Sequence, residues 1–166
     1  MAANANLFAA LRAAFPDELD RTAIETCDTP SPRFHTWRDI DRASARIANL
    51  FDSLELPEGS RVAVQVDKSV EALLLYLAVL RAGLVYLPLN TAYQAGEIEY
   101  FVGNAEPAVF VCSPRNEAWT KPLAFRAGVK NVFTLGDDRS GSLLERAAWH
   151  SDTHEPAERG AERAAA

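Results

Sequence analysis

Hydrophobic and polar residues alternate in two early segments, and the pattern then changes to a helical period. Thr22–Thr26 and Arg33–Trp37 alternate and contain β-prone residues. The turn-rich sequence 27–32 between them predicts an antiparallel hairpin. From Thr36, which is placed to cap a helix, apolar residues recur every three or four positions and predict an amphipathic helix: Ile40, Ala43, Ile47, Leu50, Phe51 and Leu54.

Further along the chain, short apolar runs alternate with helical patterns. Four runs have the composition of strands that are covered on both faces: Arg61–Val66, Leu84–Leu89, Ala108–Cys112 and Asn131–Leu135. Helices are predicted between these strands and at both ends, over 7–15, 69–82, 96–106, 121–127 and 143–149. The order predicts an α/β fold: an N-terminal β-hairpin and helix, then a mostly parallel sheet of about four strands with flanking helices.

The helix predicted from Val70 to Leu80 is apolar almost all round, and Glu71 is its one charged residue. Ser69 is placed to cap its start, and Gly83 to end it in the left-handed conformation. A helix of this kind must be covered on both sides. We infer that sequence beyond this region supplies much of the second cover. The chain then exposes an apolar patch, and we expect self-association, marginal stability or a partner chain.

The C-terminal segment 150–166 contains no large apolar residue. It cannot bury enough surface to offset its ordering entropy, so we expect a disordered tail. The predicted division is therefore a folded unit over 1–149 and a tail over 150–166.

Composition narrows the class of protein. Apolar residues make up 48% and charged residues 24% of the 166, which is typical of one globular domain. The net charge of -6 argues against nucleic acid and anionic membranes as partners. The longest apolar run, about 11 residues, is too short for a membrane span. No secretory signal is recognisable, and Cys27 and Cys112 are far apart, which favours reduced thiols in the cytoplasm.

Few residues suggest chemistry. Asp67 and Lys68 follow a predicted strand, where α/β proteins often bind ligands, but a solvated loop accounts for them equally simply. Cys112 ends a buried strand and is interpreted as a packed thiol. His35 alternates within the hairpin and is interpreted as structural.

Two other motifs are weaker still. His150 and His154 have the spacing of a helical metal pair, but Pro156 follows them in the tail. The segment Gly136–Ser142, GDDRSGS, is the nearest match to a phosphate-binding loop, although it lacks a lysine and a turn explains it as well. Neither G-x-G-x-x-G after a strand nor G-x-x-x-x-G-K-[ST] occurs. We therefore assign no catalytic, cofactor-binding or metal-binding residue.

The middle of the chain resembles a known family. DKSVEALLLYLAVLRAGLVYLPLNTAY, residues 67–93, and GEIEYFVGNAEPAVFVCSP, residues 96–114, resemble the N-terminal region of the adenylate-forming acyl-CoA synthetases, and among them the malonyl-CoA synthetases. The matching motifs are Arg81-Ala82-Gly83, Pro88-Leu89-Asn90 and Glu97-Ile98-Glu99-Tyr100. The resemblance covers about residues 4–148 and implies part of the large N-terminal domain, in which Pro88-Leu89-Asn90 is architectural.

The resemblance also implies what this sequence lacks. Complete family enzymes use ATP, Mg²⁺ and CoA, and their lysine-bearing phosphate loop, ribose-binding aspartate and C-terminal domain have no counterpart here. No family functional residue can be transferred, so we expect no cofactor for this chain and an N-terminal fragment that is inactive alone. The alternative is a non-catalytic module that binds a partner chain through the surface the missing part would cover. A flavodoxin-like signalling domain would need an acidic cluster at the strand ends, which the sequence does not contain.

Overall fold

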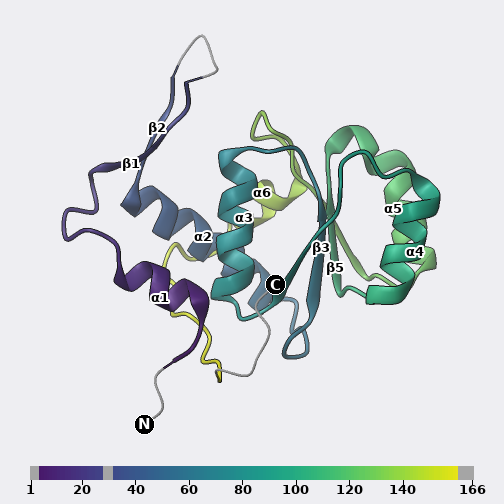
Figure 1. Cartoon of the computed structure of the whole chain (residues 1–166), viewed down its shortest axis with the longest axis horizontal. Coiled ribbons are helices and arrows are strands. Elements are labelled where there is room, and N and C mark those ends of the chain that lie inside the picture. Colours follow the sequence, from purple (N-terminus) through teal and green to yellow (C-terminus); the bar gives the residue numbers. More distant parts are fainter. Residues whose placement is uncertain (1–3, 28–31, 161–166) are drawn as a thin grey trace.

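A computed structural model of the chain describes residues 4–27 and 32–160, and a parallel sheet lies between two groups of helices (Figure 1). The order of its strands is β4 (Val85–Pro88), β3 (Arg61–Gln65), β5 (Val109–Cys112) and β6 (Asn131–Thr134). A separate antiparallel hairpin precedes it, formed by β1 (Thr22–Glu25) and β2 (Phe34–Thr36). The predicted fold class is confirmed, while most of the predicted hairpin turn lies outside the described residues.

The helices divide between the two faces of the sheet (Figure 1). One face carries α1 (Leu7–Ala13), α2 (Trp37–Asp52), α3 (Val70–Arg81) and α6 (Ser142–Ala147), and the other carries α4 (Ala95–Ala105) and α5 (Glu117–Arg126). A 3-10 turn, η1 (Pro114–Asn116), leads into α5. None of the helices in the described part of the chain is both long and apolar enough to cross a bilayer.

Helix α5 starts earlier than predicted. The pattern placed its start at Lys121, whereas the structure places it at Glu117. Two contacts support the added first turn: Thr120 Oγ1 donates to the Asn116 carbonyl at 2.7 Å, and Lys121 pairs with Glu117 at 3.0 Å. Pro122 lies inside the helix.

Strand alternation builds a separate core on each face of the sheet. In β5, Val109 and Val111 pack against the α2 and α3 side, while Phe110 and Cys112 pack against α4 and α5. All four side chains are fully buried. Strands that are apolar on both faces are what a sheet covered by helices on both sides requires.

Helix α3 is bounded as the sequence predicts. The Ser69 hydroxyl accepts a hydrogen bond from the Ala72 amide at 3.0 Å. At the other end Gly83 has a φ of 67°, and the Leu84 amide bonds to the Val79 carbonyl at 2.9 Å. This pairing is the Schellman form of helix end, for which glycine is the favoured residue.

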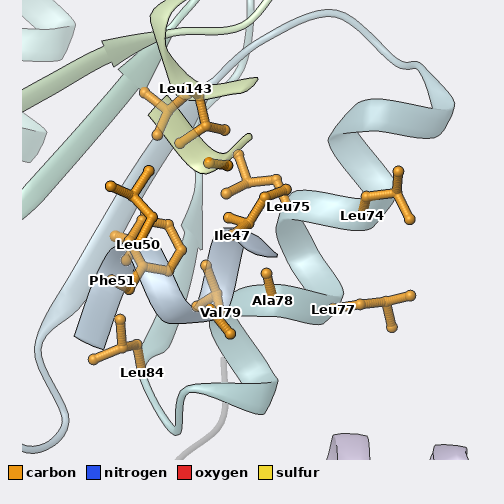
Figure 2. Close-up of a cluster of buried hydrophobic side chains, with 14 of the residues drawn as sticks. Ile47, Leu50, Phe51, Leu74, Leu75, Leu77, Ala78, Val79, Leu84 and Leu143 are labelled. Carbon is orange, nitrogen blue, oxygen red and sulfur yellow. The ribbon is translucent and has the colours of Figure 1, made fainter. Parts of the chain in front are cut away.

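Both sides of α3 are covered, largely by this chain itself. Figure 2 shows Leu75 and Val79 directed toward α2, with Leu74 and Leu77 on the other side of the helix. All four are buried, and α1 packs on that second side. The expectation that much of the second cover comes from other sequence is therefore wrong. Leu73 remains 42% exposed beside an apolar groove of about 310 Å³, and self-association stays a prediction.

The C-terminal segment also differs from the expectation of disorder. Residues 150–160 lie in an extended path against α2 and α3. The Asn49 side chain donates to the carbonyls of Ser151 and Thr153, both at 2.9 Å, and the Ala157 amide donates to the Arg81 carbonyl at 2.9 Å. The expectation considered apolar burial alone, whereas this segment docks through backbone hydrogen bonds and through polar side chains such as His154 and Arg159. Residues 161–166 lie outside the described part.

Candidate functional site

The carboxyl edge of the sheet holds a buried glutamine rather than a ligand-binding cluster. Gln65, at the end of β3, is fully buried, and its Nε2 donates to the carbonyls of Asn90 and Tyr93, both at 3.0 Å. These bonds fix the chain as it leaves β4 through Pro88-Leu89-Asn90. The amide of Ala92 bonds to Asn90 Oδ1 at 2.9 Å and tightens the same turn. The loop is therefore fixed by hydrogen bonds to Gln65 and within itself, which suits an architectural role.

Asp67 and Lys68 follow Gln65 and do not converge on a cavity. Arg115 lies 2.8 Å from the Asp67 carboxylate, and the Ser113 hydroxyl donates to it at 3.3 Å. Lys68 makes no hydrogen bond or ion pair within the described residues. The pair thus matches the solvated-loop interpretation.

Cys112 is a packed thiol, as predicted. Its side chain is fully buried, and Thr120 Oγ1 lies 3.2 Å from its Sγ. Burial raises the pKa of the Cys112 thiol. A thiol held in its neutral form is a poor nucleophile.

Several backbone amides of the loop Gly136–Ser142 form hydrogen bonds within the loop or to β6. The Gly136 amide donates to the Ser140 carbonyl at 2.8 Å, and the Ser142 amide donates to Thr134 Oγ1 at 3.0 Å. The Ser140 amide and hydroxyl both bond to Asp138 and lower the pKa of that carboxyl. A phosphate cradle needs free amides that point at the ligand. These residues therefore do not fit the phosphates of ATP as a backbone cradle.

The three histidines do not form a metal site. His154 Nε2 lies 2.9 Å from Asp52 Oδ2, and residues 150–154 are not helical, so the spacing of His150 and His154 does not place both rings on one helical face. His35 lies in β2, and its Nε2 is buried without a hydrogen-bond partner. Among the described residues, no group of three His, Cys, Asp or Glu side chains could hold a metal ion.

Two buried charges were missed by the sequence analysis. The Arg81 side chain is 1% exposed and lies 2.8 Å from Asp41 Oδ1. Burial lowers the pKa of the Arg81 guanidinium, and Asp41 opposes that shift. Glu71 is 2% exposed, and its nearest cation is Arg139, with 3.2 Å between Nε and Oε1. The one signal for Glu71 was a lone acid in an otherwise apolar helix.

Family membership follows from comparison with known proteins. The model of the AMP-binding enzyme family matches residues 11–165. The chain belongs to this family. It corresponds to the N-terminal region of an adenylate-forming enzyme, and the resemblance noted in the sequence is confirmed.

Three proteins illustrate the range of similarity. MatB from Rhodopseudomonas palustris is 42% identical, with a TM-score of 0.88 over 97% of this chain. The probable CoA ligase CCL9 of Humulus lupulus is 28% identical over 133 residues, or 80% of this chain. A benzoate CoA ligase from Burkholderia xenovorans is 17% identical with a TM-score of 0.80, which shows the shared fold alone. A second structure of MatB is bound to ATP and has a TM-score of 0.84.

The chain spans a minor part of these proteins. It covers 31% of MatB, 30% of the benzoate ligase and 25% of the hop ligase. The activities of these longer proteins belong to polypeptides of which this chain covers less than a third.

Proposed function

We propose that this chain is scaffold for an ATP-dependent acyl-CoA ligase whose acid substrate is malonate. In such an enzyme the acid is activated as an acyl-adenylate and then transferred to CoA. The observation that carries the proposal is the 42% identity to MatB, a malonyl-CoA synthetase, over nearly the whole chain, compared with 17% to the benzoate ligase of the same fold. The motifs at residues 81–83, 88–90 and 97–100 support the family as a whole rather than the malonate subgroup.

The 166 residues by themselves are proposed to be inactive. Transfer of an adenylyl group requires positive charge and hydrogen-bond donors aimed at the phosphates. The sequence has no lysine-bearing phosphate loop, and four amides of the Gly136–Ser142 loop, those of residues 136, 139, 140 and 142, are already bonded within the loop or to β6. Purified chain with malonate, ATP and Mg²⁺ is expected to release no pyrophosphate above a protein-free control. Release at the rate of an intact synthetase would overturn this part of the proposal.

A graft tests the scaffold role. Residues 4–148 replace the matching part of an intact malonyl-CoA synthetase, and malonyl-CoA formation is measured. The matched control graft carries the corresponding part of the benzoate ligase. We expect the first graft to keep substantial activity and the second to lose it, because helix and strand contacts to the rest of the domain must fit closely. Equal activity, or equal loss with both grafts folded, would contradict membership of the malonate subgroup.

A further inference from the structure

A charged pocket lies beside the loop that follows β6. Its volume is about 540 Å³, and it is bordered by β2, α2, α3, α6 and the loop before α6. Four arginines line it: Arg33, Arg42, Arg46 and Arg139. They exceed the two carboxylates of the lining, although the whole chain carries a net charge of -6. The lining of the pocket thus carries more positive than negative charge on an acidic protein.

Arg139 is held at this pocket by two unusual features. Its φ of 71° is left-handed, a conformation that costs a non-glycine residue about 1–2 kcal/mol. Its Nε lies 3.2 Å from Glu71, a carboxylate whose side chain is only 3% exposed and which has no aligned hydrogen bond within the described residues. A guanidinium has five donors, so Arg139 can face Glu71 and still donate to a ligand. Strained residues of this kind gather at binding sites.

Arg42 and Arg46 converge from the opposite wall. They are one helical turn apart on α2, and both approach Asp152 Oδ2, at 3.7 and 3.8 Å. These distances are ion-pair distances, too long for hydrogen bonds. The Asp152 carboxylate therefore indicates where an oxyanion is attracted. Arg46 also donates through Nη1 to the Ala148 carbonyl at 2.9 Å, which leaves its Nε and Nη2 together with the donors of Arg42 for a ligand.

The remaining walls favour an organic ligand. Phe34 and Leu74 provide apolar surface. His35 also lines the pocket, and its Nε2 is buried without a hydrogen-bond partner. The volume is within the range of about 300–1,000 Å³ that small-molecule pockets occupy. An apolar wall beside several guanidinium groups suits a molecule with an anionic head and an apolar body.

We propose that this pocket binds the phosphate group of a small organic ligand through Arg42, Arg46 and Arg139, in competition with the carboxylate of Asp152. Phosphate is favoured because its tetrahedral oxygens can accept from several forked guanidinium groups at once. The site is independent of the proposed ligase activity, since none of its residues belongs to the scaffold motifs discussed above.

The test is a calorimetric titration of the full 166-residue chain at constant ionic strength. The probes are phenyl phosphate, inorganic phosphate and the dicarboxylate succinate. Phenyl phosphate is expected to bind most tightly and succinate most weakly. The variant carrying Arg42→Gln and Arg46→Gln should weaken phenyl phosphate binding at least tenfold, the order expected for losing charge-assisted hydrogen bonds, about 1.5–3 kcal/mol each.

Arg38→Gln is the matched control, because Arg38 lies on the same helix but pairs with Asp20 at 2.6 Å outside the pocket. It should change the dissociation constant less than about twofold. Asp152→Asn should tighten binding by about two- to fivefold, as expected for removing a competing exposed carboxylate. Thermal melts of each variant establish that it is folded.

Three results would overturn the proposal. The first is no saturable binding of either phosphate probe to the folded chain. The second is equal weakening by Arg38→Gln and by the double variant, which would indicate nonspecific attraction. The third is succinate binding as tightly as phenyl phosphate, which would remove the phosphate assignment.

Discussion

The tripeptide Arg-Ala-Gly ends two helices on opposite faces of the sheet, at residues 81–83 and 126–128. The backbone is nearly the same at both ends. Gly83 has a φ of 67° and Gly128 a φ of 89°, and each is followed by an apolar residue whose amide bonds five residues back, at 2.9 and 3.0 Å. The local sequence therefore fixes the helix stop in the same way twice.

The arginines have opposite environments. Arg126 is exposed at the end of α5. Arg81 is buried, donates to Asp41, to Ser44 at 3.1 Å and to the His154 carbonyl, and lies 4.7 Å from the centre of the Phe8 ring. One arginine ends a helix at the surface, and the other joins α1, α2, α3 and the C-terminal segment. The difference teaches that a helix-end motif predicts backbone geometry, while tertiary contacts decide what its charged side chain does.

The largest expected effect separates the two arginines. Arg81→Met should lower the free energy of unfolding by about 3 kcal/mol, because it leaves buried acceptors without their cation. Arg126→Met should change it by less than about 0.5 kcal/mol, as is usual for an exposed substitution. Urea unfolding followed by circular dichroism measures both. Equal effects would show that Arg81 contributes only as a helix-end cation.

The two glycines offer a smaller contrast. Gly128→Ala should cost about 1 kcal/mol, because alanine is strained at positive φ and no other atom crowds the new methyl group. Gly83→Ala should cost more, since its Cβ would also meet the guanidinium of Arg159, which contacts the Gly83 carbonyl. Denaturant midpoints of the single variants test the order.

A double variant isolates the Arg159 contribution. In an Arg159→Ala background the cost of Gly83→Ala should fall to that of Gly128→Ala, because the crowding is removed. If the two glycines already cost the same in the original chain, the C-terminal segment does not press on the end of α3.

These helix ends also mark what the sequence could predict. Apolar periodicity identified the central strands and helices, and glycine identified both helix stops, because these depend on nearby residues. Arg81 could not be placed in the interior, since its partners Asp41 and His154 lie 40 and 73 residues away along the chain. Docking of residues 150–160 was missed for the same reason. It depends on carbonyl groups, which no side-chain pattern reveals, and on polar side chains whose partners are distant in sequence, such as His154 with Asp52.

The same distinction between nearby and distant residues applies to the candidate site residues. Cys112 could be recognised as a packed thiol from its strand, and Asp67 as a loop residue from its position. The arginine pocket could not be predicted, because Arg33, Arg42 and Arg139 come from three separate elements. Only the folded chain brings them to one cavity.

The smallest expected effect on the free energy of unfolding concerns the contact between the C-terminal segment and Arg81. His154 offers Arg81 its backbone carbonyl, while its ring contacts the Asp52 carboxylate at 2.9 Å. His154→Ala removes the ring and keeps the carbonyl. It should therefore cost no more than about 1 kcal/mol: the ring is only 7% exposed, but its partner Asp52 is 58% exposed, which keeps the contact near the range of a surface pair.

The measurement is again urea unfolding, together with hydrogen exchange of the Ala157 amide, which bonds to the Arg81 carbonyl. That amide should stay protected in His154→Ala and lose protection in Arg81→Met. The two variants thus distinguish docking by backbone from docking by side chain. If His154→Ala destabilised the protein as much as Arg81→Met, the imidazole rather than the carbonyl would hold this segment. The larger contribution of Arg81 to stability, compared with Arg126, would then depend on the His154 ring.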